Sequence, residues 1–171
     1  MTVRVTEKLI CDYLVVGAGA APLAFIDTIL TELPQSKVIL IDKKAVPGGQ
    51  WVDAYGYVHL HQPSLVYGLS SKQLEGNWLK LMLSEFTLPW KHRASKKEIL
   101  KYYGGFVNKK VESKQLEWYP NTTYDFEKKD NSVQDGIHYF TSADGLVSYE
   151  VKVNSKLVDG TQGECVIPHS K

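Results

Sequence analysis

Residues 13–19 read Tyr-Leu-Val-Val-Gly-Ala-Gly, and this stretch decides the fold of the chain. An apolar run leads into a glycine turn, an apolar-rich segment follows over residues 23–33, and a second apolar run over residues 38–41 ends at Asp42. Strand, glycine turn, helix, strand and acid in this order are typical of a dinucleotide-binding βαβ unit. The sequence therefore predicts an α/β fold in which a Rossmann-like parallel sheet is covered by helices.

The predicted turn has the chemistry of a pyrophosphate site. The first turn of a helix offers unpaired backbone N–H groups and the positive end of the helix dipole. Gly17 lets the chain turn out of the strand, and Gly19 has no Cβ atom, so phosphates can approach the backbone. Ala20 and Ala21 follow as candidate phosphate contacts. We expect Asp42 to accept hydrogen bonds from the adenosine ribose, with the end of a strand as its alternative role.

Pro22 stands where the third glycine of such a turn is expected. Proline is tolerated in the first turn of a helix, because the N–H group that it lacks has no intrahelical partner there. It still removes one potential phosphate donor and adds bulk. We therefore expect the fold to survive and the affinity for the cofactor to be lower.

A second pair of glycines, Gly48 and Gly49, precedes Gln50 and Trp51. This pair indicates a flavin adenine dinucleotide rather than a nicotinamide dinucleotide. Trp51 is open to two interpretations, as a wall of the cofactor cleft or as part of the core. Nearby, Lys43 and the lysine after it are expected to form a solvated strand end, and recognition of a 2′-phosphate is the alternative for Lys43.

Periodicity and capping signals place further elements along the chain. Ser95 followed by Glu98 forms a capping-box pattern, which marks the start of a helix. Residues 43–83 lack clear periodicity and are expected to be irregular. The expected elements up to Pro120 are a buried strand over residues 9–16, a helix over 20–33, a strand over 37–42, a helix over 95–111 and a strand over 115–119.

After Pro120 the pattern changes to short, partly alternating segments with turn signals at residues 130–131 and 144–145. These segments, over residues 123–128, 137–142 and 147–154, predict an antiparallel β-meander inserted at about residues 122–154. A further strand over residues 156–161 is expected to return the chain to the main sheet. We interpret residues 1–171 as a single, incomplete FAD/NAD(P)-binding domain.

Composition and charge exclude several classes of protein. The 171 residues are 43% hydrophobic and 23% charged, which is ordinary for one globular domain with a core, and the net charge of +1 gives no reason to expect nucleic-acid or membrane partners. The N-terminus lacks the apolar core of a signal peptide, so we expect a cytoplasmic protein. The two cysteines and five histidines have no metal-ligand spacing, and we expect no metal.

Several segments together resemble the flavoprotein monooxygenase superfamily, which contains the flavin-containing and Baeyer–Villiger monooxygenases. The resemblance is closer to the FAD/NAD(P)-binding oxidoreductases of that type and runs from about residue 12 to residue 168. The glycine turn occurs in many families, whereas the second and third segments are more specific. The matching segments are residues 12–19, 47–51 (Pro-Gly-Gly-Gln-Trp), 60–64 (Leu-His-Gln-Pro-Ser), 67–68 (Tyr-Gly), 93–96 (Arg-Ala-Ser-Lys) and 156–161.

The resemblance implies a glutathione-reductase-like FAD-binding fold, in which the flavin carries the redox chemistry and the protein positions it. It gives no general acid or base. The residues that it assigns are Gly17, Gly19 and Asp42 to pyrophosphate and ribose, Gly49, Gln50 and Trp51 to the FAD cleft, Gln62 and Ser64 to the surroundings of the flavin ring, and Thr161 to a strand-end motif that is matched loosely.

The implied function is the FAD-binding portion of an NAD(P)H-dependent flavin oxidoreductase or monooxygenase acting on a small organic substrate. Members of that superfamily carry a second glycine-rich turn for NADPH, which this sequence lacks, so NAD(P)H is expected only with a complementary C-terminal half. Truncation would also expose core surface, and we expect self-association. Two alternatives remain: a non-catalytic remnant that binds nucleotide weakly or a protein partner, and a plain NAD-dependent dehydrogenase domain.

Overall fold

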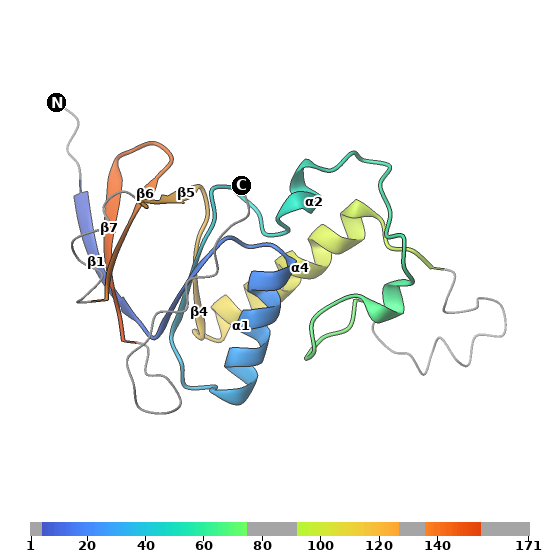
Figure 1. The fold of residues 1–171 in the computed structure, drawn as a ribbon, viewed down its shortest axis with the longest axis horizontal. Helices are drawn as coiled ribbons and strands as arrows, with labels where there is room; N and C mark the ends of the chain where they lie inside the picture. Colours follow the sequence, from blue (N-terminus) through green and yellow to red (C-terminus); the bar gives the residue numbers. More distant parts are fainter. Residues whose placement is uncertain (1–4, 75–91, 127–135, 155–171) are drawn as a thin grey trace.

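The computed structural model describes residues 5–74, 92–126 and 136–154 and contains two β-sheets (Figure 1). One is a three-stranded parallel sheet in the order β2-β3-β4. The helices α1 and α4 pack on one face of it through a shared cluster of buried side chains. The predicted α/β fold with a Rossmann-like parallel sheet is therefore confirmed. The element bounds are β2 Tyr13–Val16, α1 Ala20–Glu32, β3 Val38–Ile41, α4 Lys96–Glu112 and β4 Leu116–Tyr119.

The second sheet has four strands in the order β1-β7-β6-β5. Strands β5, β6 and β7 pair antiparallel, as expected for the β-meander, and β1 adds to the edge of this sheet parallel to β7. The turn between β6 and β7 contains Gly145 at φ 69, which is where a turn was predicted. The bounds are β1 Val5–Cys11, β5 Thr122–Tyr124, β6 Ile137–Ser142 and β7 Val147–Val153.

Strand β3 joins the two layers because both of its faces are covered. Its four residues are each 0% exposed. Val38 and Leu40 belong to the cluster shared with the helices, whereas Ile39 and Ile41 belong to the cluster shared with the four-stranded sheet. Successive side chains of a strand point to opposite faces, so a strand covered on both sides needs an uninterrupted apolar run.

The expected single strand over residues 9–16 was wrong. The chain forms two strands instead, β1 in one sheet and β2 in the other, and it changes sheets at Asp12. The backbone N–H of Lys37 donates to the carboxylate of Asp12 at 2.7 Å, and the backbone N–H of Asp12 donates to the carbonyl of Lys37 at 2.9 Å. These bonds fix the break at the point where the chain passes from one layer to the other.

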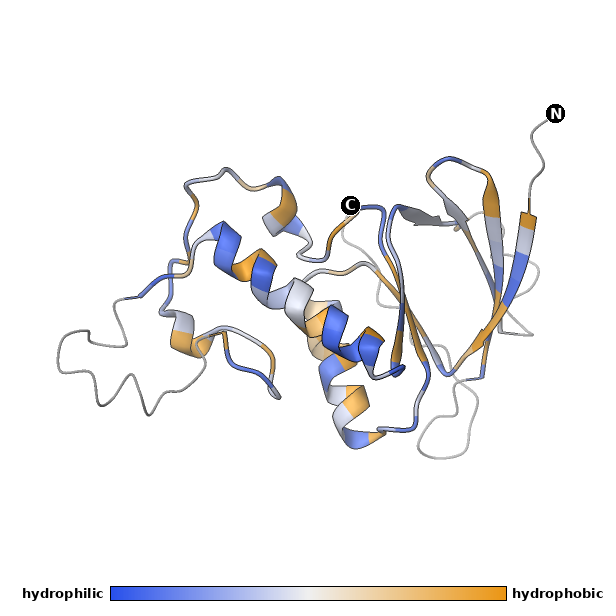
Figure 2. Ribbon diagram, turned by 180° about the vertical axis from the view of Figure 1, so that it is seen from behind, coloured by the Kyte–Doolittle hydropathy of each residue, from blue (hydrophilic) through white to orange (hydrophobic). Residues whose placement is uncertain are grey.

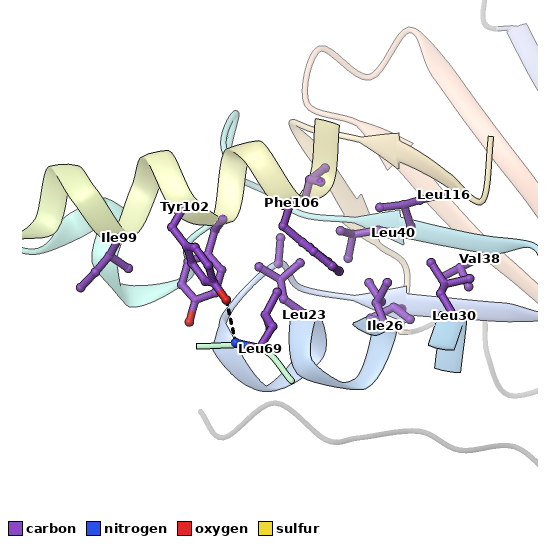
Figure 3. Packing of buried hydrophobic residues seen from close by; sticks show 14 of the residues in the cluster. Leu23, Ile26, Leu30, Val38, Leu40, Leu69, Ile99, Tyr102, Phe106 and Leu116 are labelled. Carbon is purple, nitrogen blue, oxygen red and sulfur yellow. Dashed lines mark hydrogen bonds between the residues drawn. The ribbon is translucent and has the colours of Figure 1, made fainter. Parts of the chain in front are cut away.

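Side chains from both helices interlock over β3 and β4 (Figure 3). On α1 the buried residues recur every three or four positions, which is the spacing of one helix face. Tyr102 also holds an irregular segment in place, because its hydroxyl accepts a hydrogen bond from the backbone N–H of Leu69 at 2.7 Å. The helix residues of this cluster are Leu23, Ile26 and Leu30 on α1 and Ile99, Tyr102, Tyr103, Phe106 and Val107 on α4.

The region after β3 is mostly irregular, as predicted, over the residues that the structure describes. The region expected to be irregular holds a short helix, α2 (Gln50–Asp53), and the 3-10 turn η1 (Ser64–Val66). The predicted turn at residues 130–131 and the strand over residues 156–161 lie outside the described residues. Among the residues that are described, no helix is long and apolar enough to cross a membrane.

Helix α4 starts where the capping box predicted it. Ser95 is the N-cap, its side chain accepts a hydrogen bond from the backbone N–H of Glu98, and its own backbone N–H donates to the Glu98 carboxylate at 2.8 Å. Hydrophobic residues recur among hydrophilic ones along this helix (Figure 2), and its buried residues lie three or four positions apart, as one buried helix face requires. The hydrogen bonds from Ser95 lower the pKa of the Glu98 carboxyl below its ordinary value of 4.5.

The lowered pKa of Glu98 predicts how acid affects the fold. The folded state favours the ionised carboxylate, so this stabilisation is present above pH 4.5 and is lost as the pH falls through the lower pKa of the folded state. Glu98→Gln keeps a side-chain acceptor for the cap but does not titrate. We expect the free energy of unfolding, measured in urea at pH 5 and pH 3, to fall less in this variant than in the parent. Equal losses would contradict the prediction.

Candidate functional site

The glycine turn lies at the carboxyl end of β2, where α1 begins. Gly17 is buried with φ 95, a conformation that favours glycine, and its backbone N–H donates to the carbonyl of Ile41 at 2.8 Å. Gly19 is the N-cap of α1 and makes no side-chain capping bond, and the first turn of this helix carries no acidic residue. Ala20 and Ala21 are exposed. The start of α1 is therefore an uncapped, exposed helix N-terminus, as an anion site requires.

Pro22 fits into this helix without breaking it. Helix α1 begins at Ala20 and continues to Glu32 with Pro22 in its first turn. The expectation that the fold survives this proline is confirmed for the helix. Its expected effect on cofactor affinity stays a prediction.

Asp42 connects the end of β3 to the glycine turn. Its side chain is largely buried, with 8% of the residue exposed, and one carboxylate oxygen accepts a hydrogen bond from the backbone N–H of Ala18 at 2.6 Å. The other oxygen accepts one from the backbone N–H of Lys44 at 2.7 Å. An ionised carboxylate has about four acceptor positions, so capacity for further donors remains. Binding of a ribose by Asp42 stays a prediction.

The two glycine pairs of the sequence lie in contact in the structure. The backbone N–H of Gly48 donates to the carbonyl of Ala18 at 2.8 Å. A Cβ atom on Gly49 would lie 2.7 Å from the Cα of Gly19, and Gly49 has φ 55 with ψ −125. A non-glycine residue at position 49 would therefore meet both a steric clash and an unfavourable backbone conformation. The structure brings the two predicted segments together as one unit.

Lys44 fixes this unit from the outside. Its ammonium group donates to the carbonyl of Gly49 at 2.8 Å and forms an ion pair with Asp53. The Lys44 side chain is only 20% exposed, whereas that of Asp53 is 73% exposed. The ammonium of Lys44 lowers the pKa of the Asp53 carboxyl. The expectation of a solvated strand end holds for Lys43, which is exposed, and was wrong for Lys44.

A second lysine holds the opposite end of α2. The ammonium group of Lys96, at the start of α4, donates to the carbonyls of Val52 at 2.9 Å and Ala54 at 2.7 Å. Cations are favourable at the C-terminus of a helix, where the carbonyls have no intrahelical partner. Together, Lys44 and Lys96 fix the segment that carries Gln50 and Trp51. The roles of both lysines could not be predicted from the sequence, because each binds carbonyl groups in a different segment of the chain.

Trp51 is part of the core, which is one of the two interpretations that the sequence left open, and its role as a wall of the cofactor cleft stays a prediction. Its indole packs against the core cluster, and its Nε1 donates to the hydroxyl of Tyr67 at 3.0 Å. With Gln50, Ala54 and Val58 it also lines an open cavity of about 270 Å³ beside α2. Gln50 is exposed next to this cavity.

The two residues assigned to the surroundings of the flavin ring differ in their environment. Gln62 is exposed. Ser64 is 0% exposed, and its hydroxyl accepts from the backbone N–H of Ala94 at 2.6 Å and donates to the carbonyl of His92 at 3.2 Å. The Ser64 side chain therefore joins two loops through backbone groups. Thr161 lies outside the described residues, and among the described ones no cluster of three metal-ligating side chains occurs.

Comparison with curated sequences gives relatives of unassigned function, and no family model matches the chain. Uncharacterized proteins of Mycobacterium bovis and Mycobacterium tuberculosis are each 34% identical over 158 residues, which cover 92% of this chain and 27% of the relative. The chain therefore spans about a quarter of the length of these curated relatives.

Comparison with solved structures identifies the fold as a portion of flavoenzyme folds. A closed structure of cyclohexanone monooxygenase matches 85% of this chain and 25% of its own, with a TM-score of 0.54 and 21% identity. A flavin-containing monooxygenase from Stenotrophomonas maltophilia matches 84% of this chain and 37% of its own chain, with a TM-score of 0.55 and 16% identity. A bacillithiol disulfide reductase from Staphylococcus aureus matches 85% of this chain and 36% of its own chain, with a TM-score of 0.54 and 11% identity.

The contact between the glycine pairs predicts that position 49 accepts glycine alone. Gly49→Ala places a Cβ atom 2.7 Å from the Gly19 backbone at a positive φ, and we expect it to lower the free energy of unfolding by about 2–3 kcal/mol. Gly56→Ala is the matched control, because a Cβ atom there meets nothing within 4 Å. Urea unfolding measures both, and a Gly49→Ala variant as stable as Gly56→Ala would refute the contact.

The neighbouring lysines give a second matched pair. Lys44→Met removes the bonds to Gly49 and Asp53, and we expect it to cost about 1 kcal/mol of unfolding free energy. Lys43→Met removes an exposed charge, so its effect should stay within about 0.5 kcal/mol. Both are measured by urea unfolding at one salt concentration. If the two substitutions have equal effects, Lys44 does not hold the glycine segment.

Proposed function

We propose that this chain is the FAD-binding part of an NAD(P)H-dependent flavin oxidoreductase or monooxygenase that acts on a small organic substrate. The observation that carries the proposal is the side-chain-free contact between Gly19 and Gly49 at the uncapped start of α1. The absence of side chains lets the two backbones pack together, and in the proposal a diphosphate binds the uncapped backbone N–H groups beside this contact. The likeness to parts of two monooxygenases and a reductase supports the same class.

The residues present fit such a cofactor. In the proposal, the backbone N–H groups at the start of α1 bind the pyrophosphate, and Asp42 binds the ribose with the acceptor capacity that its two backbone bonds leave. Lys44 and Lys96 fix α2, so that Gln50 and Trp51 form a rigid wall of the cleft. When bound, the flavin would supply the redox chemistry, while these residues bind and orient it. Lys43 is exposed beside this edge and remains available for a 2′-phosphate.

A flavin oxidoreductase of this class also needs NAD(P)H and a second protein region that binds it. The curated relatives are much longer than the region that they share with this chain. We propose that NAD(P)H is bound by sequence outside this region, and that a complementary half, or a second copy of the chain, covers the remaining surface.

Uptake of FAD tests the proposal directly. The chain is incubated with FAD, passed through gel filtration, and its visible spectrum is recorded; we expect the absorption bands of oxidised flavin to travel with the protein. Pro22→Gly restores one N–H donor in the first turn of α1, so it should retain more flavin per protein than the parent. Binding of NADH without uptake of FAD would favour a dehydrogenase domain. A chain that binds neither would favour a non-catalytic remnant.

A further inference from the structure

Asp27 is a buried carboxylate in the middle of α1 that takes no part in the glycine turn. It is 1% exposed and lies on the helix face that packs into the core. Burying an ionised carboxylate is costly unless donors bind it. In the part of the chain that the structure describes, Asp27 forms no ion pair, and both of its oxygens bind a single residue, Ser71. The one contact of this costly group is therefore with the segment that carries Ser71.

Ser71 belongs to a loop that we call the clasp loop and define as residues 68–73. The backbone N–H of Ser71 donates to Oδ2 of Asp27 at 2.8 Å, and its hydroxyl donates to Oδ1. A β-bridge between Gly68 and Gln73 closes the loop. The carboxylate thus binds both donors of one residue, which fixes the position of the clasp loop on α1.

Tyr102 ties the same loop to α4. Its hydroxyl accepts a hydrogen bond from the backbone N–H of Leu69 at 2.7 Å (Figure 3) and donates to the carbonyl of Lys72. Leu69 is 5% exposed and belongs to the core cluster, and the ammonium of Lys72 lies 5.5 Å from the centre of the Tyr102 ring. The clasp loop is therefore held by one polar side chain from each of the two helices that cover the sheet.

The clasp loop is joined to the cavity beside α2 by the residue that precedes it. Tyr67 comes directly before Gly68, and its hydroxyl accepts hydrogen bonds from Trp51 Nε1 at 3.0 Å and from the Tyr103 hydroxyl at 2.9 Å. Trp51 lines that cavity. Gly68 has φ 142, and a Cβ atom there would lie 2.8 Å from the Tyr102 hydroxyl oxygen, so only glycine fits this close approach. Movement of the clasp loop therefore reaches the indole of Trp51 through Tyr67.

We propose that Asp27 is a positioning residue, which acts through Ser71 and Tyr67 to hold Trp51 in its place beside α2. Helix α1 then fixes the α2 segment at two points, by the backbone contact with Gly49 and by the clasp loop at Trp51. This positioning does not depend on the ligand that the cavity takes, whereas its use for FAD rests on the proposed function.

Exchange of the Trp51 indole hydrogen with solvent tests the proposal. The chain has four tryptophans, so NMR of the isotope-labelled whole chain gives four indole N–H signals, of which Trp51→Phe identifies one. Asp27→Asn and Ser71→Ala each remove one bond between α1 and the clasp loop. Ser70→Ala, at the exposed neighbouring residue, is the matched control.

We expect Asp27→Asn and Ser71→Ala each to raise the exchange rate of the Trp51 indole hydrogen about fivefold, the factor for one lost hydrogen bond. Ser70→Ala should change this rate by less than about twofold. The indole signal of Trp118, which packs against the same core cluster from β4, reports on general unfolding and should change by less than about twofold in every variant. An equal rise at Trp51 and Trp118 would overturn the proposal.

A double variant separates positioning from ordinary stabilisation. Tyr67→Phe removes the acceptor through which Asp27 acts on Trp51. Adding Asp27→Asn to Tyr67→Phe should therefore raise the exchange of the Trp51 indole hydrogen no further, since effects within one chain of contacts are not additive. Additive effects in the double variant would mean that Asp27 anchors the clasp loop without positioning Trp51.

Uptake of FAD tests whether this positioning serves the cofactor. At a limiting FAD concentration, we expect Asp27→Asn to retain about threefold less flavin per protein after gel filtration than Ser70→Ala, because a less ordered site binds more weakly. Equal retention would overturn the link to the cofactor. A parent chain that takes up no FAD refutes the proposed function alone, and the indole exchange rates then still decide on Asp27.

Discussion

Gly49 rests on Gly19 with no side chain between them, and the arrangement of the candidate site depends on this contact. A Cβ atom on Gly49 would come within 2.7 Å of the Gly19 backbone. Three further interactions hold the contact in place: Asp42 binds the N–H of Ala18, Gly48 donates to the carbonyl of Ala18, and Lys44 binds the carbonyl of Gly49. The first two tie Asp42 and Gly48 to the residue before Gly19, and the third fixes Gly49 itself.

At this contact the exposed polar groups belong to the backbone, and side chains hold the backbone segments in position. Lys44 and Lys96 hold α2 at both ends by binding carbonyl oxygens, and the indole of Trp51 packs against the core and donates to the hydroxyl of Tyr67. The cavity beside α2 is lined by Gln50, Trp51, Ala54 and Val58.

Much of the βαβ unit could be predicted, because its signals are local. The glycine turn, the helix after it and Asp42 lie within residues 13–42, and the capping box lies within four residues. The break at Asp12 could not be predicted, since apolar residues flank it on both sides and its cause is a hydrogen bond to Lys37. The roles of Lys44, Lys96 and Tyr67 depend in the same way on partners in other segments of the chain. The sequence has no pattern that predicts which backbone carbonyl a long polar side chain will bind.

The pairing of β1 with β7 has a consequence for how the protein is made. Val5 pairs with Val147, so the first described strand has its partner in the last one. Translation adds about 5–20 residues per second, so a nascent β1 stays without that partner for about 7–28 s. During that interval an edge with unpaired backbone groups is exposed at the ribosome. Glu7 and Lys8, both exposed on β1, supply the charges that discourage pairing with other nascent chains until β7 emerges.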